Sequence, residues 1–570
     1  MRALMDRYAR GSIVEKIWLK HYPKGVPAEI DIKEYGSIRD VFEESVAKYA
    51  SRRAFTCMGK SITFADLDVL SRAFGAWLQA KGCKKGTRVA LMMPNILQYP
   101  ICLFGVLRAG CTAVNVNPLY TARELEHQLK DSGAEVLVVL ENFARTVQEV
   151  IGKTKVKQVV VTSIGEQLGF KGIAVDWVLR HRRKMVPAWK IARAVRLAKV
   201  LAQGRKHKLE KVPLTHDDIA FLQYTGGTTG VAKGAMLLHR NIVANLLQAR
   251  AWVKPFLDPN QAEVIITPLP LYHIFSLTAN CLTFMTLGAE NVLIPNPRDI
   301  PGFVKEMAKH RFTGITGVNT LFNVLVNNEK FGKLDFSGLR LTLGGGMAVQ
   351  EAVAEKWQMV TGKPLIEAYG LTETSPAATI NPLDLPKYNG SIGLPISSTE
   401  VMLRDDAGME VPLGHPGEIC IRGPQVMAGY WQHPEETAKV LDKDGWFATG
   451  DIGIMDRQGF IKIVDRKKDM IIVSGFNVYP NEIEGVVVMH PGVLECAAVG
   501  IPDKKSGEAV KLFVVKKDAR LTTDELLRHC RDHLTNYKVP REVEFRKDLP
   551  KTNVGKILRR ELRDEARKAA

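Results

Sequence analysis

Short runs of apolar and β-branched residues alternate with longer helix-period stretches over residues 61–374, and this alternation restricts the fold more than any other feature. Helical periodicity occupies segments such as 64–82 and 121–133. Strands that alternate with helices predict an α/β fold class, with mostly parallel sheet covered by helices on both faces. Ligands of such folds bind in the loops that follow strands. The strand-like runs lie at 88–93, 135–140, 158–162, 219–224 and 263–267.

The sequence changes character after about Pro395, where short strands punctuated by glycine continue as far as Val464. This texture predicts an antiparallel or mixed β-rich subdomain. A charged run at 465–469 then separates two apolar strands and predicts a linker. We therefore expect a large N-terminal domain over 1–464, a hinge linker over 465–469 and a small α+β C-terminal domain over 470–570.

Composition excludes several classes of protein. The chain is 46% hydrophobic and 25% charged, which is typical of a soluble globular protein rather than a disordered one. No apolar run approaches the ~20 residues that span a bilayer, and the N-terminus lacks the apolar core of a secretory signal. The 8 cysteines are scattered, without CxxC pairs or metal-ligand spacing to histidine. This pattern predicts reduced, mostly buried thiols in a cytoplasmic protein.

The net charge of +18 is unusual, and more than half of it lies in one segment. Residues 180–211 hold twelve Lys or Arg against one acidic residue. Within this segment a basic residue recurs every three positions, at Lys190, Arg193, Arg196 and Lys199, which predicts a helix with a basic half. Such a face is either solvated or docks to an anionic membrane surface.

Nucleic acid is a further candidate partner for a basic chain. Binding it through a basic patch requires the charge to lie on one face together with aromatic residues that stack on bases. Only Trp177 and Trp189 accompany the basic segment, and no nucleic-acid-binding motif is present. We therefore expect no nucleic-acid partner.

A loop rich in glycine and threonine, 224–234, directly follows the strand-like run at 219–224. Glycines let backbone N–H groups approach an anion, threonines add hydroxyl donors and Lys233 adds a positive charge, so the loop predicts a phosphate cradle. It is not a Walker A motif, because Lys233 neither follows a glycine nor precedes Ser or Thr. A flexible turn is the alternative. The candidate residues are Tyr224, Thr225, Gly226, Gly227, Thr228, Thr229, Gly230 and Lys233.

Two more motifs follow strand-like runs. Residues 369–374 provide an aromatic ring, a hydroxyl and a carboxylate, which suit a purine, a phosphate oxygen and Mg²⁺ respectively. A strand-to-helix connection capped by Thr372 is the alternative. The successive glycines Gly344, Gly345 and Gly346 allow a planar ring to lie against the backbone, although three glycines also form an ordinary turn.

Two single residues complete the set of candidates. Asp451 follows a Gly turn and offers a carboxylate that suits the two hydroxyls of a ribose, although a solvated turn is the commoner role of such a pair. Lys556 lies between Gly555 and an apolar pair in a basic loop near the C-terminus. This placement presents it at a site, whereas the composition alone would also suit a solvated tail.

In this order, from about Phe42 to Arg567, the motifs resemble those of the ANL superfamily of adenylate-forming enzymes. Several stretches resemble bacterial long-chain fatty-acid–CoA ligases most closely. They are 93–100 (MPNILQYP), 115–120 (NVNPLY), 269–275 (LPLYHIF), 463–471 (IVDRKKDMI), 473–483 (VSGFNVYPNEI) and the Lys556 loop.

The resemblance implies that a fatty acid is activated with ATP and then transferred to coenzyme A, through an acyl-adenylate. Neither step needs a nucleophilic side chain, so charge stabilisation and alignment carry the chemistry. The loop 224–233 is implied to hold the β- and γ-phosphates. Tyr369 and the three glycines are implied at adenine, Thr372 at phosphate and Glu373 at Mg²⁺.

The other roles follow in the same way. Asp451, with Arg466 nearby, is implied at the ribose, and Lys556 between the acyl carboxylate and the α-phosphate. His273 is implied near the carboxylate and the coenzyme A channel, although a packed core histidine is the alternative. Rotation of a mobile C-terminal domain is implied to separate the two steps. Lys468 occupies the hinge position, and Gly475 is expected to flank the pantetheine channel after rotation.

Two positions bear on specificity and on departures from the family pattern. Short-chain relatives carry Trp where this chain has Gly370, so an open pocket for a medium or long acyl chain is implied. Many relatives carry Ser or Thr before the His-x-Asn that follows the phosphate loop, whereas this chain has Leu238, which puts one local hydrogen bond in doubt.

Three alternatives stay open on the residues. An aryl-acid or medium-chain CoA ligase uses the same motifs and differs in its pocket. A fatty acyl-AMP ligase would stop at the adenylate, and the absence of an insertion between Val464 and Met470 disfavours it. A membrane-surface protein is the third. We expect a cytoplasmic enzyme that is peripheral on the inner face of the cell membrane through 180–211. A homodimer is left open as its oligomeric state.

Overall fold

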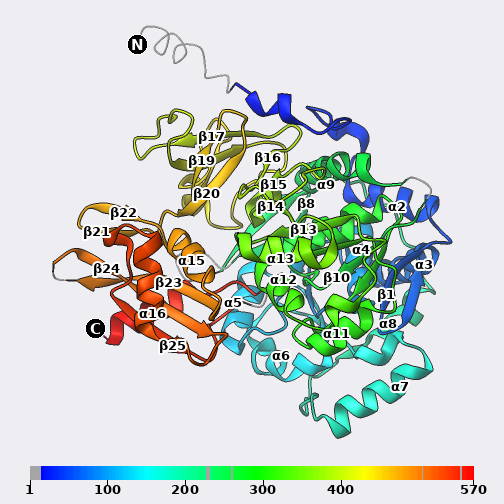
Figure 1. The fold of residues 1–570 in the computed structure, drawn as a ribbon. Coiled ribbons are helices and arrows are strands. Elements are labelled where there is room, and N and C mark those ends of the chain that lie inside the picture. Colours follow the sequence, from blue (N-terminus) through cyan, green and yellow to red (C-terminus); the bar gives the residue numbers. More distant parts are fainter. Residues whose placement is uncertain (1–14, 226–231, 259–260, 504, 553–554, 570) are drawn as a thin grey trace.

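In a computed structural model, the chain is described over residues 15–225, 232–258, 261–503, 505–552 and 555–569. These residues form four β-sheets (Figure 1). Two large sheets and a four-stranded sheet precede residue 467, and the fourth sheet follows it.

The first large sheet has seven strands in the order β7-β6-β5-β3-β4-β8-β9. All of its pairings are parallel except that between β8 and β9. The expected strands at 88–93, 135–140, 158–162 and 219–224 are confirmed as members of this sheet. The strands are β7 (Val195–Arg196), β6 (Gln158–Thr162), β5 (Val136–Leu140), β3 (Arg88–Met92), β4 (Thr112–Asn115), β8 (Ile219–Thr225) and β9 (Lys233–Leu238).

Alternate side chains of this sheet are buried on opposite faces. Val89 and Leu91 of β3 join a core with the helices α3 (Phe64–Ala80), α4 (Gln98–Arg108) and α9 (His239–Val253). Ala90 and Met92 join another core with α5 (Ala122–Ser132) and α6 (Ala144–Val150). Helices therefore cover both faces, as expected for parallel strands.

Helix α5 shows how local sequence sets the element boundaries. Thr121 accepts a hydrogen bond from the backbone N–H of Glu124, whose side chain bonds back to Thr121. The helix ends at Gly133, which has φ +61. The two signals fix the helix within the predicted segment 121–133.

The second large sheet has nine strands, with parallel pairings in its centre and antiparallel strands at both edges. Helices α11 (Ile300–Met307), α12 (Asn319–Val326) and α13 (Glu351–Thr361) contribute to a separate core with this sheet. In order, the strands are β16 (Leu394–Pro395), β15 (Ala377–Ile380), β14 (Ile366–Gly370), β13 (Leu341–Gly345), β12 (Gly314–Gly317), β10 (Val264–Thr267), β11 (Glu290–Leu293), β1 (Arg53–Cys57) and β2 (Lys60–Thr63).

The β-rich texture after Pro395 corresponds to an antiparallel four-stranded sheet. Its strands are β17 (Glu400–Arg404), β18 (Gly417–Arg422), β19 (Phe447–Met455) and β20 (Ile461–Arg466). The last strand thus includes the first two residues of the expected linker.

The segment after the linker is a small α+β unit, which lies beside the large part of the molecule (Figure 1). Its sheet carries the helices α15 (Pro480–Val488), α16 (Thr523–His533) and α17 (Arg559–Ala569). The strands are β21 (Ile471–Val473), β22 (Phe476–Val478), β23 (Val493–Asp503), β24 (Gly507–Lys516) and β25 (Glu542–Arg546).

The helix expected from the basic repeat at 190–199 is wrong. Arg193 has φ +62, Arg196 lies in the edge strand β7, and a helix, α8 (Leu197–Gly204), begins only afterwards. Arg180 and Arg196 both pair with the buried carboxylate of Glu141, at 2.8 and 2.7 Å. These ion pairs and the pairing of β7 with β6 determine the backbone here. Basic residues at every third position do not by themselves require a helix.

A search of the described ranges finds no helix with the length and apolar character needed to cross a membrane.

Candidate active site

A cavity of about 1910 Å³ lies between the large part of the chain and the small C-terminal unit. The carboxyl ends of β8, β13 and β14 contribute to its wall, as expected for a parallel sheet. Strand β20 and residues 551–552 and 556–558 of the C-terminal unit also line it. The cavity therefore collects residues from all the predicted motifs that the structure describes.

Tyr369, Asp451 and Arg466 form one connected group in this cavity. The hydroxyl of Tyr369 donates to Oδ2 of Asp451 at 2.7 Å, and Nε of Arg466 lies 3.0 Å from Oδ1. Asp451 is buried within β19 rather than placed in a solvated turn, and it faces Arg466 of β20 in the sheet register. The Asp451 carboxylate raises the pKa of Arg466. A rigid carboxylate beside an aromatic ring suits a nucleoside.

Glu373 follows β14 in a single 3-10 turn, Thr372–Thr374, and is buried. Burial raises the pKa of its carboxyl group. The hydroxyl of Tyr430 donates to Oε1 of Glu373 at 2.8 Å. Thr372 lines the same part of the cavity, so the hydroxyl and carboxylate predicted in this motif are brought together.

Lys233 is the first residue of β9, and its ammonium group lies 5.4 Å from the centre of the Tyr430 ring. It forms an ion pair with Glu436. Lys233 therefore lies at the cavity with its charge already partnered by a carboxylate.

Only part of the expected phosphate loop is described. Thr225 ends β8 opposite Lys233, and both line the cavity. The hydroxyl of Tyr224 donates to Asp131 at 2.5 Å, so this residue anchors the base of the loop. Gly226, Gly227, Thr228, Thr229 and Gly230 lie outside the described residues.

The three glycines lie at the carboxyl end of β13. Gly344 and Gly345 belong to the strand, and Gly346 follows it with φ +79, a conformation that favours glycine. A Cβ atom at Gly346 would lie 3.5 Å from Cε of Lys556. The glycine backbone and Lys556 are thus direct neighbours.

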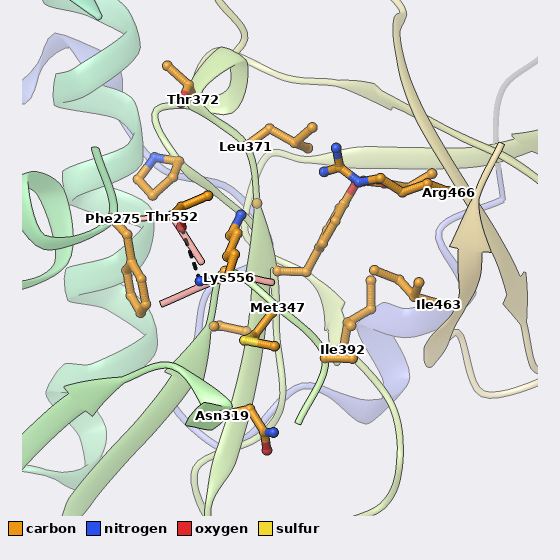
Figure 2. A pocket seen from close by; sticks show the side chains of 18 of the residues that line it. Phe275, Asn319, Met347, Leu371, Thr372, Ile392, Ile463, Arg466, Thr552 and Lys556 are labelled. Carbon is orange, nitrogen blue, oxygen red and sulfur yellow. Dashed lines mark hydrogen bonds and ion pairs between the residues drawn. The ribbon is translucent and has the colours of Figure 1, made fainter. Parts of the chain in front are cut away.

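Lys556 extends from the C-terminal loop into the middle of the cavity, between Phe275 and Arg466 (Figure 2). Its backbone N–H donates to Oγ1 of Thr552 at 3.1 Å, which shapes the loop. Burial, together with the nearby charge of Arg466, lowers the pKa of Lys556 to about 8, against the opposite influence of Asp451 and Glu373. The structure therefore brings Lys556 to the same site as the other predicted residues.

His273 also lines the cavity, at the start of the short helix α10 (Ile274–Ser276). Its Nδ1 accepts a hydrogen bond from the backbone N–H of Phe275 at 3.4 Å, which leaves the ring proton on Nε2. Burial and the charge of Lys556 lower the pKa of His273 to about 3. The ring is therefore neutral near pH 7.

The linker is tied to the C-terminal unit by ionic contacts. Nη1 of Arg559 lies 3.5 Å from Asp465 and 3.9 Å from Asp469. The carbonyl of Lys468 accepts from Arg563 at 3.0 Å, and burial lowers the pKa of Lys468. Gly475, with φ +83, turns between β21 and β22, and the space around its missing Cβ is open.

Gly370 lines the cavity, but its position has a second explanation. A Cβ atom there would lie 1.8 Å from the carbonyl oxygen of Pro376, on the adjoining antiparallel segment. Any side chain at 370 would therefore displace the backbone of this chain. A substitution of Gly370 does not test the depth of an acyl pocket.

An apolar part of the cavity lining, which we call the apolar branch, is the better place to test the depth of an acyl pocket. It passes between α9, the π-helix η8 (Leu277–Thr283) and the strands β13 and β15. No local motif marks this branch, because its residues come from four distant elements. Its lining includes Ala249, Val253, Ala279, Phe284, Leu341 and Ile380.

Sequence reasoning also missed residues that support the site. Tyr430 and Glu436 hold Glu373 and Lys233, and Asp131 holds Tyr224. Leu238 has no side-chain hydroxyl for the hydrogen bond that the sequence put in doubt. The backbone N–H of Leu238 instead donates to Oδ1 of Asn241 at 2.9 Å. None of these residues lies in a sequence pattern that predicts its partner.

Together, the two-part fold and this cavity define a nucleotide-binding enzyme, in which the small C-terminal unit contributes Lys556 to the cavity. Two family models match the chain: AMP-binding enzyme over 42–431, and AMP-binding enzyme C-terminal domain over 482–556. The chain belongs to the AMP-binding enzyme family.

Particular relatives are similar over nearly the full length. A long-chain-fatty-acid–CoA ligase from Yersinia pestis is 60% identical, covering 97% of this chain and 98% of its own. One from Escherichia coli O6:H1 is 59% identical, covering 97% and 99%. Among solved structures, the anthranilate CoA ligase AuaEII in complex with anthranoyl-AMP is similar with a TM-score of 0.83 and 26% identity, covering 95% and 99%.

Proposed function

We propose that this cavity activates a long-chain fatty acid with ATP and passes it to coenzyme A. The chain is an AMP-forming acid–thiol ligase: a carboxylate oxygen attacks the α-phosphorus, the bond to the pyrophosphate oxygen breaks, and acyl-adenylate forms. The thiol sulfur then attacks the acyl carbon as AMP leaves, and the thiol proton is lost to solvent. The observation that carries this proposal is that Lys556, which is half-buried, lies in one cavity with Asp451, Arg466 and Glu373.

The polar half of the cavity supports the nucleotide part of this reaction. We assign Tyr369 and the backbone at Gly344, Gly345 and Gly346 to adenine, and Asp451 with Arg466 to the ribose. The 224–233 loop and Thr372 are assigned to the phosphates. Preorganised donors of this kind stabilise charge that develops in the transition state.

Mg²⁺ is a proposed partner of the triphosphate, and Glu373 fits it in part. Tyr430 occupies only Oε1, which leaves Oε2 as an oxygen ligand of the kind Mg²⁺ prefers. Over the described ranges, no cluster of three His, Cys, Asp or Glu side chains could hold a metal alone. The ion would therefore be held mainly by phosphate oxygens, whose charge it neutralises.

Lys556 is assigned to the first step, where it bridges the acyl carboxylate and the α-phosphate. Neutral His273 is assigned to the mouth of the thiol channel, as a hydrogen-bond donor rather than a cation. Because a thiol must enter where the Lys556 loop lies, we propose that the C-terminal domain rotates about Lys468 between the steps. Gly475 would then flank the pantetheine.

The apolar branch is assigned to the acyl chain. Each buried methylene contributes ~0.8 kcal/mol, so a branch of this kind favours long acids over short ones. The 54–60% identical relatives support this assignment over the medium-chain or aryl-acid alternative.

Pyrophosphate release measured over saturated C2–C18 and aryl acids, with and without coenzyme A, tests the proposal. We expect release with long acids, and thioester only when coenzyme A is present. Ala279→Phe fills the branch and is expected to shift the preference to shorter acids, by a factor of about 4 for each excluded methylene. Ala352→Phe, on the polar side of the cavity, is the matched control. Preference for aryl acids, or an unchanged chain-length profile in Ala279→Phe, would contradict the acyl assignment.

Association with an anionic membrane surface, and a homodimer, complete the proposal. The first rests on the charge of 180–211 and on the poor solubility of long acids in water.

A further inference from the structure

An exposed apolar surface lies just before the basic segment, on helix α7 (Phe170–Trp177) and the chain that follows it. Phe170, Ile173 and Trp177 occupy one face of the helix, at positions i, i+3 and i+7. Met185 follows after the π-turn 178–182. We name these four residues the α7 surface. Their exposed fractions are 95%, 71%, 58% and 54% for Phe170, Ile173, Trp177 and Met185 respectively.

The opposite face fixes the helix firmly to the protein. Gly172 packs so closely on Gly165 that a Cβ at Gly172 would lie 1.8 Å from the Gly165 carbonyl oxygen. Asp176 accepts hydrogen bonds from Oγ of Ser163 at 2.6 Å and from the backbone N–H of Gly165 at 2.8 Å. The apolar residues are therefore exposed on an anchored element, and α7 lies at the outer rim, away from the C-terminal unit (Figure 1).

Three consecutive cations, Arg182, Arg183 and Lys184, are exposed directly beyond the helix. The acidic side chains of this stretch are engaged elsewhere: Asp176 holds the helix, and Glu166 accepts from the backbone N–H of Ser163 at 3.4 Å. The positive charge beside the α7 surface is thus not compensated by its own segment.

We propose that the α7 surface docks on an anionic lipid bilayer. Its aromatic and aliphatic side chains enter the headgroup boundary, and Arg182, Arg183 and Lys184 pair with lipid phosphates. Aromatic rings beside cations are the combination that an interface favours, because one partner is apolar and the other is hydrated and charged. The proposal rests on the membrane association proposed above, but not on the adenylation chemistry. It moves the contact from 180–211 to 170–185.

Co-sedimentation with vesicles of phosphatidylcholine, with and without phosphatidylglycerol, tests this on the full chain. We expect Arg182→Glu/Arg183→Glu/Lys184→Glu to lower partitioning to anionic vesicles by about 100-fold or more. Phe170→Ser/Ile173→Ser/Trp177→Ser is expected to lower it by about tenfold or more. Two matched controls are expected to bind like wild type: Met359→Ser, at a side chain that is 77% exposed on α13, and Arg205→Glu/Lys206→Glu/Lys208→Glu.

A second measurement locates the contact. Acyl chains brominated near the headgroup are expected to quench part of the tryptophan emission of wild type, and that part is absent in Trp177→Phe. Pyrophosphate release with a long acid carried on serum albumin, in the absence of vesicles, and the melting temperature are expected to stay unchanged in the surface variants. This result would separate a docking defect from misfolding or from a failure of the proposed reaction.

Several outcomes would overturn the proposal. If wild type does not bind anionic vesicles, both the proposed membrane association and the proposed role of the α7 surface are wrong. If wild type binds and the α7 variants bind equally, the surface alone falls. If the basic control variant loses vesicle binding to the same extent, the binding depends on the overall positive charge and not on the α7 surface. If the α7 variants dissociate an oligomer but still bind vesicles, the α7 surface contacts a second copy of the chain.

Discussion

The two domains contribute to the active cavity in different ways. Asp451 and Arg466 lie on neighbouring strands and are held by the sheet register and by an ion pair of 3.0 Å. Lys556 comes from the small domain, whose contacts with the large domain include hydrogen bonds from Thr320 to Gly555 of the Lys556 loop, at 3.1 Å, and from Asn323 to Leu494 of β23, at 3.3 Å. Asp451 and Arg466 are thus fixed within one sheet, whereas Lys556 is held in the cavity by contacts between the two domains.

This difference separates binding from chemistry. The fixed side is suited to hold the nucleotide through both half-reactions, because it does not depend on the position of the small domain. Under the proposed domain rotation, the side that carries Lys556 is detachable and supplies a charge that only the first half-reaction needs. Substitutions on the two sides are therefore expected to differ in which step they impair, as well as in size.

The largest effect is expected from Lys556→Ala. Lys556 is proposed to stabilise charge in the transition state, so its loss is expected to slow adenylate formation by about 100- to 1,000-fold. Thioester formation from supplied acyl-adenylate is expected to be unchanged. Single-turnover assays of each half-reaction measure this, with Lys547→Ala, at an exposed lysine of the same domain, as control. Equal loss of both steps would contradict the division between the two sides.

Asp451→Asn is expected to act on both half-reactions. It removes a charged acceptor from Tyr369 and Arg466, and hydrogen bonds to charged groups contribute about 1.5–3 kcal/mol, equivalent to about 10- to 100-fold in kcat/KM for ATP. Thioester formation is expected to fall as well, since the proposed ribose contact of Asp451 would also hold AMP. The exposed Asp444→Asn, in the same subdomain, is the control. An effect confined to adenylate formation would place Asp451 with the detachable side.

The pH dependence is expected to follow Lys556. Only the protonated ammonium can bridge two anions, and burial lowers its pKa to about 8. The kcat/KM of adenylate formation should therefore fall above about pH 8, by about tenfold per unit, because this constant reports the free enzyme. The falling limb is expected to vanish in Lys556→Arg, whose guanidinium stays charged. His273, with its pKa at about 3, adds no limb near neutrality. A limb that persists in Lys556→Arg would exclude Lys556 as its origin.

The smallest effect is expected from Thr320→Val/Asn323→Leu, which removes both hydrogen bonds to the small domain. Each contributes about 0.5–1.5 kcal/mol, so adenylate formation is expected to slow by about 5- to 100-fold, and the lower end is expected because both contacts are only part-buried. Thioester formation is expected to be unchanged or faster, since the small domain leaves more readily. Val324→Ala, at an exposed side chain of the same helix α12, serves as comparison. A slower second step would show that these contacts also serve the rotated state.

The sequence predicted the motif residues that line this cavity better than the residues that hydrogen-bond to them. Strand-like runs placed the Gly344 and Tyr369 motifs at strand ends, since side-chain period and strand order impose that geometry. Tyr430, Glu436 and Asp131 lie far along the chain from the residues they hold, so no local pattern could pair them.

Charge spacing was the weakest guide. The repeat at 190–199 predicted a helix, but Arg196 is held in an edge strand by Glu141, a partner about fifty residues away. The same reasoning passed over Phe170 and Ile173, because an apolar helix face predicts burial until the fold shows that nothing covers it.

The ion pair between Lys233 and Glu436 has a consequence for nucleotide exchange. On the phosphate assignment proposed for Lys233, an arriving triphosphate does not meet a bare cation. It replaces one anionic partner with another, and Glu436 is returned to water. Few small counter-ions are then displaced at this position, because the protein has supplied its own. The affinity for ATP is accordingly expected to vary less steeply with ionic strength than the number of basic groups in the cavity would indicate.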